Sequence, residues 1–222
     1  MNWLYKLERK YSKYAINNLM QYIIMSTVTI YILQYIMKIN LYPYLAFIPK
    51  LVMEGQIWRV ITFIFLPPYA SVFSMILMSY FFYMIGNTLE YQWGSFKFNI
   101  YYLFGIIGAI IAAFITGYGT NTYLNLSLFL AFAYMFPDVE VNLFYLIPIK
   151  IKWLAYLDWF YFGYSLIFGS FGVKVATVMS LINFFIFFGK DFINFIKNRK
   201  RYGSVQRNFR KEMRKANSKK KY

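Results

Sequence analysis

Residues 55–63 read GQIWRVITF and place the pair Trp58–Arg59 within a long apolar sequence. A guanidinium group stays charged and carries five N–H donors, so it can hold several backbone carbonyls together in a loop at the membrane boundary. Indole rings are favoured at the same depth, beside the lipid headgroups. The stretch therefore predicts an interfacial loop with Trp58 and Arg59 as its structural motif. The alternative for Arg59 is a cation that only snorkels to the interface.

The sequence on both sides of this stretch, residues 38–70, is apolar but interrupted by Pro43, Pro49, Pro67 and Pro68. Proline removes a backbone donor and breaks regular helix. We therefore expect irregular or interfacial backbone here and not a membrane span. Residues 138–153 are a second interfacial candidate.

Six other segments approach the length of about 20 apolar residues that a transmembrane helix requires. They are residues 15–37, 71–89, 98–118, 122–136, 154–168 and 173–189. The fourth and fifth are short, so we expect other helices to surround them. The predicted fold is an all-α membrane protein: a six-helix bundle over residues 15–190 with an irregular interfacial first loop. A basic N-terminal segment (1–14) precedes it and a basic tail (191–222) follows it.

The composition favours the same class. Of 222 residues, 60% are hydrophobic and only 14% are charged, which is far more apolar than a soluble domain. The net charge is +16, yet residues 15–37 and 98–134 carry no charged side chain. A nucleic-acid-binding protein would instead line a folded polar surface with its basic residues. We expect the lipid bilayer as the partner and no specific nucleic acid.

The basic residues also predict a topology. If both termini are cytoplasmic, only Lys38, Lys50, Arg59 and Lys174 lie outside, which agrees with the positive-inside rule for an even number of spans. The tail has twelve Lys or Arg residues in 197–222 and should be attracted to anionic lipid by about 1 kcal/mol per residue near the surface. The alternative is a topology determinant without a partner. We expect a multi-pass protein of the plasma membrane.

The chain contains no histidine and no cysteine. It therefore lacks the commonest general base, the commonest metal ligand and any thiolate, and we expect neither a metal nor a cofactor. Three polar residues in the spans have two interpretations each. Asp158 couples ions or bonds nearby Lys or Trp donors, and Asn183 binds a substrate or a neighbouring helix. Lys174 is a base with a lowered pKa or an interfacial anchor.

Three motifs follow one another in the order of a known family. They are Trp58-Arg59, the passage Gly86-Asn87-Thr88-Leu89-Glu90 with Gly94-Ser95, and Phe136-Pro137 with 147–153. Together they resemble the rhomboid superfamily, and the chain is especially similar to rhomboid-like proteins of low-GC Gram-positive bacteria. The resemblance implies a six-helix core in which Gly86, Glu90 and Gly94 are structural. The Glu90 carboxylate would accept backbone N–H bonds from the tight Gly94-Ser95 turn or the start of the helix that follows it.

The chain departs from the family's pattern where the chemistry lies. An active rhomboid has a Gly-x-Ser-Gly nucleophile on its fourth helix, a histidine on its sixth, and histidine and asparagine on its second. The corresponding fourth-helix positions are Thr120, Asn121, Thr122 and Tyr123, and Ser74 and Met78 stand on the second. The catalytic dyad is absent, so we expect no enzyme.

The resemblance thus implies a pseudoprotease that binds other transmembrane segments for client recognition or quality control. A second hypothesis is a small transporter or channel that uses Asp158 and Asn183, although the chain shows neither an inverted repeat nor paired intramembrane charges. A third is an atypical protease in which Lys174 activates Thr122 or Ser127.

The six-span topology is testable with two reporters on the full chain. We expect a reporter fused after Tyr222 to report the cytoplasmic side and one inserted within residues 46–55 to report the opposite side. Protease protection in sealed vesicles provides the measurement. Protection of both reporters to the same degree would refute an even number of spans.

Overall fold

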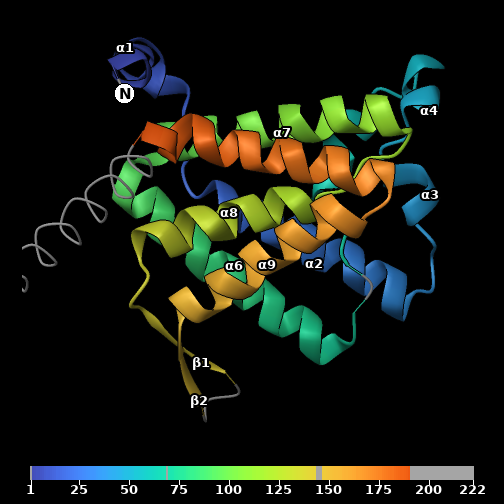
Figure 1. Ribbon diagram of the computed structural model, residues 1–222. Coiled ribbons are helices and arrows are strands. Elements are labelled where there is room, and N and C mark those ends of the chain that lie inside the picture. The colour runs from blue at the N-terminus through green and yellow to red at the C-terminus, as the bar shows by residue number, and fades with distance from the viewer. Residues whose placement is uncertain (1, 69, 144–146, 191–222) are drawn as a thin grey trace, which may run out of the picture. The chain divides into compact units, whose positions relative to one another are not determined.

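The structure, a computed structural model, describes residues 2–68, 70–143 and 147–190, and it is mostly helical (Figure 1). The longer helices are α1 (Asn2–Tyr11), α2 (Leu19–Ile36), α6 (Val72–Trp93), α7 (Ser95–Thr116), α8 (Thr122–Met135), α9 (Ile151–Phe168) and an unlabelled helix over Phe171–Lys190. The chain divides into two compact units, Met1–Phe184 and Phe185–Tyr222. The contacts described below lie within the first unit. The predicted basic tail, 191–222, lies outside the described residues.

Each predicted span overlaps one of these helices, but the helices differ in length and apolar character. Four are long and apolar enough: α2, α6, α7 and Phe171–Lys190. Helix α8 has 14 residues, fewer than the roughly 20 of a typical span, and α9 contains both Lys152 and Asp158. The all-α membrane class is therefore supported, whereas the number of six spans stays a prediction.

The first loop is irregular, as the prolines predicted. It consists of four short elements: α3 (Tyr42–Leu45), α4 (Pro49–Met53), α5 (Arg59–Thr62) and the 3₁₀ helix η2 (Phe63–Phe65). Proline stands in the first turn of both α3 and α4, where the missing N–H would have no intrahelical partner. A short 3₁₀ helix, η1 (Ser12–Tyr14), likewise joins α1 to the segment before α2.

A β-hairpin follows α8, and our sequence analysis did not predict it. Strands β1 (Glu140–Leu143) and β2 (Ile147–Lys150) pair antiparallel, with Glu140 opposite Lys150. Lys152 Nζ lies 2.9 Å from Asp138 Oδ1 at the base of the hairpin. This ammonium lowers the pKa of the exposed Asp138 carboxyl. Within the predicted interfacial segment 138–153, residues Glu140–Leu143 and Ile147–Lys150 thus form a small two-stranded sheet, and α9 begins at Ile151.

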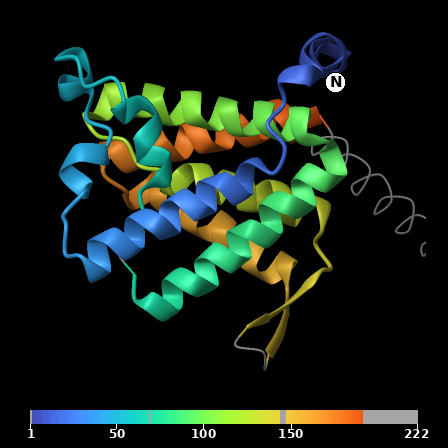
Figure 2. The same cartoon turned by 180° about the vertical axis from the view of Figure 1, so that it is seen from behind.

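Glycines on the long helices allow close approach between backbones. At Gly86 on α6 a Cβ would collide with the Met20 side chain of α2, and at Gly105 on α7 it would collide with Leu124 of α8. Helices α2 and α6 run side by side as a result (Figures 1 and 2). In lipid, where burial of apolar surface gives no drive between helices, such close packing is a main source of association.

Polar contacts mark the end of the bundle that carries α1. Lys97 Nζ on α7 pairs with Glu8 Oε2 of α1 at 3.1 Å, and Asn99 Nδ2 donates to the Ile16 carbonyl at 3.1 Å. Trp93 Nε1, at the end of α6, donates to the Met135 sulfur at the end of α8. The ends of α6 and α8 and the beginnings of α2 and α7 therefore share one side of the bundle.

The packing of Gly105 yields a stability prediction. Gly105→Val should overpack the contact with Leu124 and lower the free energy of unfolding by about 1–3 kcal/mol. Gly163→Val on α9 is the matched control, because nothing lies within 4 Å of a Cβ built there. Thermal unfolding in detergent measures both variants. Equal stability of the two variants would contradict the close packing of α7 on α8.

Candidate functional site

Arg59 is buried at the centre of the first loop, with 3% of its surface exposed. Its Nη1 donates to the Ala46 carbonyl at 2.7 Å and its Nη2 to the Pro43 carbonyl at 2.6 Å. Its Nε donates to Gln56 Oε1 at 2.7 Å. A guanidinium that joins loop carbonyls is the geometry expected of the Trp-Arg motif. The burial argues against a cation that only snorkels.

Together with Arg59, two further side chains form a cap of hydrogen bonds on the end of α3. Trp58 Nε1 donates to the Tyr44 carbonyl at 3.1 Å, and Thr62 Oγ1 donates to the Leu45 carbonyl at 3.0 Å. Together with Arg59, they satisfy the carbonyls of residues 43–46 in unbroken order. These are the carbonyls at the end of α3, which have no partner within that helix. The sequence analysis anticipated Arg59 and missed the part played by Thr62.

Asn121, one of the four predicted nucleophile-region positions, holds the other end of the loop. Its Nδ2 donates to the carbonyls of Ile64 and Leu66 at 2.9 and 3.0 Å. Nearby, the Gly119 N–H donates to the Phe47 carbonyl at 2.9 Å. Asn121 therefore fastens the loop to the start of α8, a structural role that its place in the motif did not predict.

The hydroxyl groups of Thr120 and Thr122 form a hydrogen bond with one another. Their hydroxyl oxygens lie 2.9 Å apart, and Thr120 Oγ1 also accepts from the Thr122 N–H at 3.2 Å. On α6, Ser74 takes part in the helix cap: its N–H donates to Ser71 Oγ at 3.3 Å. These hydroxyls are thus engaged in local turn and cap geometry.

A cavity is lined by two of the positions that the resemblance aligns with the catalytic groups of an active rhomboid. Met78 and Thr122 both line a space of about 170 Å³ between α2, α6, the end of the first loop and the start of α8. Ser74 is not among the described residues that line it. The walls also include the side chains of Met20, Met75, Phe82, Asn121 and Asn125. The cavity is therefore mainly apolar, with amides at one side.

Tyr123 turns away from this cavity into the bundle. It is buried, its ring centroid lies 6.5 Å from that of Tyr161 on α9, and its hydroxyl also interacts with Ser165 and Thr177. Its carbonyl accepts a hydrogen bond from Ser180 Oγ at 2.7 Å. Five hydroxyl side chains, from three helices, thus lie close together at this position: Tyr123, Tyr161, Ser165, Thr177 and Ser180.

A second group of buried polar side chains joins α7, α8 and the helix Phe171–Lys190. The Tyr101 hydroxyl is 2.7 Å from Ser127 Oγ, and Asn183 Nδ2 donates to the same oxygen at 3.3 Å. Asn183 therefore makes the interhelical bond that we considered, although its Oδ1 has no partner among the described residues. The sequence analysis missed Tyr101. The signal that could have identified it is the presence of a tyrosine within a predicted span that has no charged residue.

Lys174 meets neither hydroxyl proposed as its partner. It lies near the start of the helix Phe171–Lys190. The hydrogen bonds of Ser127 go to Tyr101 and Asn183, and those of Thr122 are with Thr120. No hydrogen bond joins Lys174 to Thr122 or Ser127 in the part of the chain that the structure describes. The geometry gives the Ser/Thr–Lys pairing no support.

Glu90 anchors the opposite end of α6. Its Oε1 accepts from the backbone N–H of Asn18 at 2.7 Å and from Ser95 Oγ at 2.7 Å. We expected backbone donors from the Gly94-Ser95 turn or the start of the next helix. Ser95 lies in that turn but donates through its side chain, and the backbone donor comes instead from the residue before α2. Gly94 adopts φ 84° and its N–H donates to the Glu90 carbonyl at 2.8 Å, which ends α6.

Asp158 is 6% exposed on α9, and neither carboxylate oxygen has a hydrogen-bond partner among the described residues. We had considered bonds to Lys or Trp donors near the boundary, and the structure contradicts this interpretation. A buried carboxylate without a partner is costly. Asp158 therefore remains a residue whose role the fold alone does not explain.

A comparison with protein-family models supports the membrane class that the apolar helices indicate. Residues 21–123 match a family model described as "Eukaryotic integral membrane protein (DUF1751)". The chain is an integral membrane protein. The match covers less than half of the chain, and the predicted similarity to bacterial rhomboid-like proteins stays a prediction. No curated protein gives a significant match to the chain.

The cap of α3 predicts how substitutions at residue 59 behave. Arg59→Ala leaves two buried carbonyls without a donor and should lower the free energy of unfolding by on the order of 1–3 kcal/mol. Arg59→Lys should recover only part of this loss, because an ammonium cannot reproduce the fork. Thermal unfolding in detergent measures both. An unchanged Arg59→Ala midpoint would reduce Arg59 to an interfacial anchor.

Proposed function

We propose that this chain is a catalytically inactive, rhomboid-like protein of the plasma membrane that binds transmembrane segments of other proteins, with both termini cytoplasmic. The observation that carries the proposal is the cavity of about 170 Å³ that Met78 and Thr122 share. It lies at the positions where the resemblance would place catalytic groups, and it offers a thioether and a neutral hydroxyl in their place. Such a lining supports the binding of a transmembrane segment without its cleavage.

The local hydrogen bonds explain why cleavage is not expected. A hydroxyl becomes a nucleophile when an adjacent base takes its proton. Thr122 bonds to Thr120, and Ser127 bonds to Tyr101 and Asn183. The chain contains no histidine to act as that base.

The shape and lining of the cavity favour an apolar side chain as its occupant. A dry cavity of about 150 Å³ holds one benzene molecule, so a space of about 170 Å³ matches one aromatic or branched side chain. The thioethers of Met20, Met75 and Met78 adapt to different shapes because they are flexible and polarizable. One side chain of a client helix, inserted from the bilayer, would fit this description.

Asp158 supports a second candidate function, an ion- or proton-coupled transporter. A buried ionisable residue within a membrane segment is often functional, and both of its oxygens lack a described partner. Ion or proton flux through the reconstituted protein, lost in Asp158→Asn, would favour this candidate over client binding.

Client binding can be tested by site-specific crosslinking of the full chain in membranes. A photoreactive residue at Met78 should capture a co-reconstituted transmembrane helix that bears an aromatic side chain, because it lines the cavity. The control is the same residue at Ile76, two positions away on α6 and 65% exposed. Capture should fall when Met75→Trp fills the cavity. Equal capture from both positions, unaffected by Met75→Trp, would contradict the proposed site.

The absence of chemistry is tested separately with a transmembrane reporter for rhomboid cleavage. Wild-type protein should cleave no more than the triple variant Thr122→Ala, Ser127→Ala, Lys174→Ala, because loss of a base typically costs 10²–10⁴-fold in rate. Quantified product on gels is the measurement. Turnover by the wild type that disappears in the triple variant would restore the protease hypothesis, with Lys174 as the first candidate base.

A further inference from the structure

An open hollow of about 530 Å³ lies at the end of the bundle opposite the first loop. Glu90 lines it together with Asn17, Asn18, Asn87, Tyr91 and Ser95. Glu90 is only 8% exposed, and its Oε2 has no hydrogen-bond partner among the described residues. By contrast, its Oε1 is fully engaged by Asn18 and Ser95. Glu90, which lines the hollow, thus carries one buried acceptor that has no partner in the part of the chain that the structure describes.

The side chains around this acceptor suit a group rich in N–H donors. Asn17, Asn18 and Asn87 provide amide oxygens, and Tyr91 is 91% exposed and can turn aside for a ligand. A single carboxylate with amides is a poor site for a divalent cation, which generally takes several carboxylates. The described residues include no group of three His, Cys, Asp or Glu that could hold a metal. An ammonium, with three N–H donors, fits better.

The basic helix α1 lies beside the same hollow. Its Glu8 reaches to 4.0 Å from a Cβ built on Gly94, which lines the hollow, and Glu8 is paired with Lys97. The helix also carries Lys6, Arg9 and Lys10. Glu90 favours a cationic group in the hollow, and the basic residues of α1 favour an anionic group on their side of it. A ligand that carries both charges meets both preferences.

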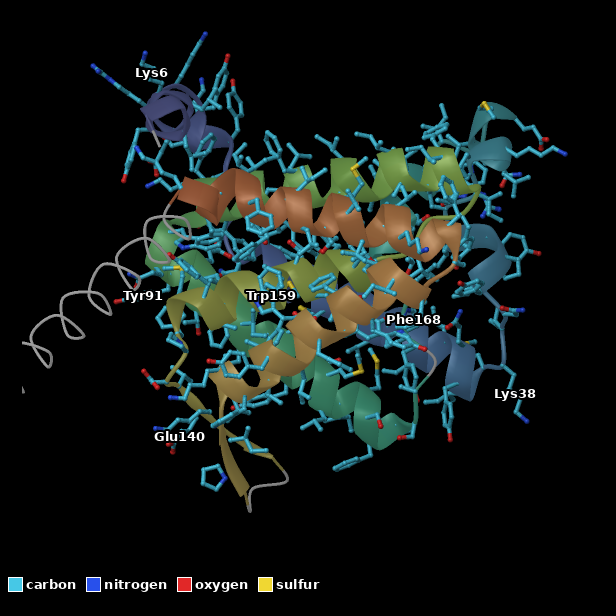
Figure 3. The ribbon with its side chains drawn as sticks, in the orientation of Figure 1. Lys6, Lys38, Tyr91, Glu140, Trp159 and Phe168 are labelled. Carbon is cyan, nitrogen blue, oxygen red and sulfur yellow. The ribbon has the colours of Figure 1, made fainter. Side chains whose placement is uncertain are left out.

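The position of the hollow indicates a lipid. Glu90 lies one turn before the end of α6, a helix long and apolar enough to cross a membrane. Figure 3 shows Tyr91 and Lys6 at one end of the bundle and Lys38 at the other. The end of a span meets the headgroup layer, where zwitterionic lipid is abundant.

We propose that this hollow binds the phosphoethanolamine headgroup of a lipid, with its ammonium on Glu90 Oε2 and its phosphate toward the basic residues of α1. Choline lipids carry the same charges but no N–H donor, so they cannot make the bond to Glu90. The site therefore selects for hydrogen-bonding capacity and not for charge. The proposal is independent of client binding, because it concerns the other end of the bundle.

The two oxygens of Glu90 make a precise variant possible. In Glu90→Gln the amide oxygen can still accept from Asn18 and Ser95, and these two donors fix the orientation of the amide. The NH₂ group then replaces Oε2 and presents donors to the ammonium. Ser95→Ala is the matched control, since it removes one bond to Oε1 and leaves Oε2 unchanged. Glu140→Gln is a second control, at an exposed carboxylate on β1.

The experiment measures binding of a fluorescent phosphatidylethanolamine to the full chain in bilayers of phosphatidylcholine with constant anionic content. Unlabelled competitor lipids carry zero to three N-methyl groups. Wild type, Ser95→Ala and Glu140→Gln should prefer the unmethylated headgroup on the order of tenfold, as expected for a hydrogen bond to a charged group. Glu90→Gln should show no preference.

Competition by soluble phosphoethanolamine separates the headgroup from the whole lipid. Displacement by millimolar soluble compound would assign the affinity to the headgroup alone, whereas displacement only by lipid would show that the acyl chains contribute; both results agree with the proposed site. Equal affinity across the methylation series would overturn the proposal. So would a preference that persists in Glu90→Gln, and either result would leave Oε2 for a cationic side chain of a partner protein.

Discussion

The cap on the end of α3 is the constraint on which the first loop depends. Four successive carbonyls, of residues 43–46, face side chains of α5 and the residue before it. A carbonyl that is buried without a partner is costly, and these four are all paired. The hydrogen bonds join the short elements α3 and α5 to one another. Asn121 then joins the end of the loop to α8.

Glu90 provides the corresponding constraint at the other end. Its Oε1 binds Asn18, the residue before α2 and 72 positions earlier in the sequence, and also Ser95 at the start of α7. Gly86, on the same helix, lets the Met20 side chain of α2 approach the α6 backbone. Arg59 and Glu90 thus carry opposite charges, yet each satisfies backbone groups at the end of a helix: Arg59 at the end of α3 and Glu90 at the start of α2.

Sequence patterns predicted the parts of this architecture that are local. The apolar segments gave the helices, the prolines gave the irregular loop, and the donors of Arg59 predicted its carbonyl partners. The hairpin was missed because it is only four residues per strand and its signal is masked by an apolar context. For Glu90 the turn that holds Ser95 was predicted and Asn18 was missed, because a distant backbone N–H leaves no trace in the spacing of residues. Tyr101 and Ser127 were not paired for the same reason, since their bond depends on how α7 crosses α8.

The residues that hold the fold are distinct from those that would perform chemistry. Arg59, Glu90 and Gly86 act on backbone ends and helix approach, and none of them needs a histidine or a serine nucleophile to do so. The hydroxyls of Thr120 and Thr122 are likewise used in a turn, and that of Ser127 in a bond between helices. The contacts named above therefore support the bundle without any histidine, since the chain contains none. The cavity that Met78 and Thr122 line has walls of thioether, ring and amide groups, and thioethers adapt to different shapes because they are flexible and polarizable.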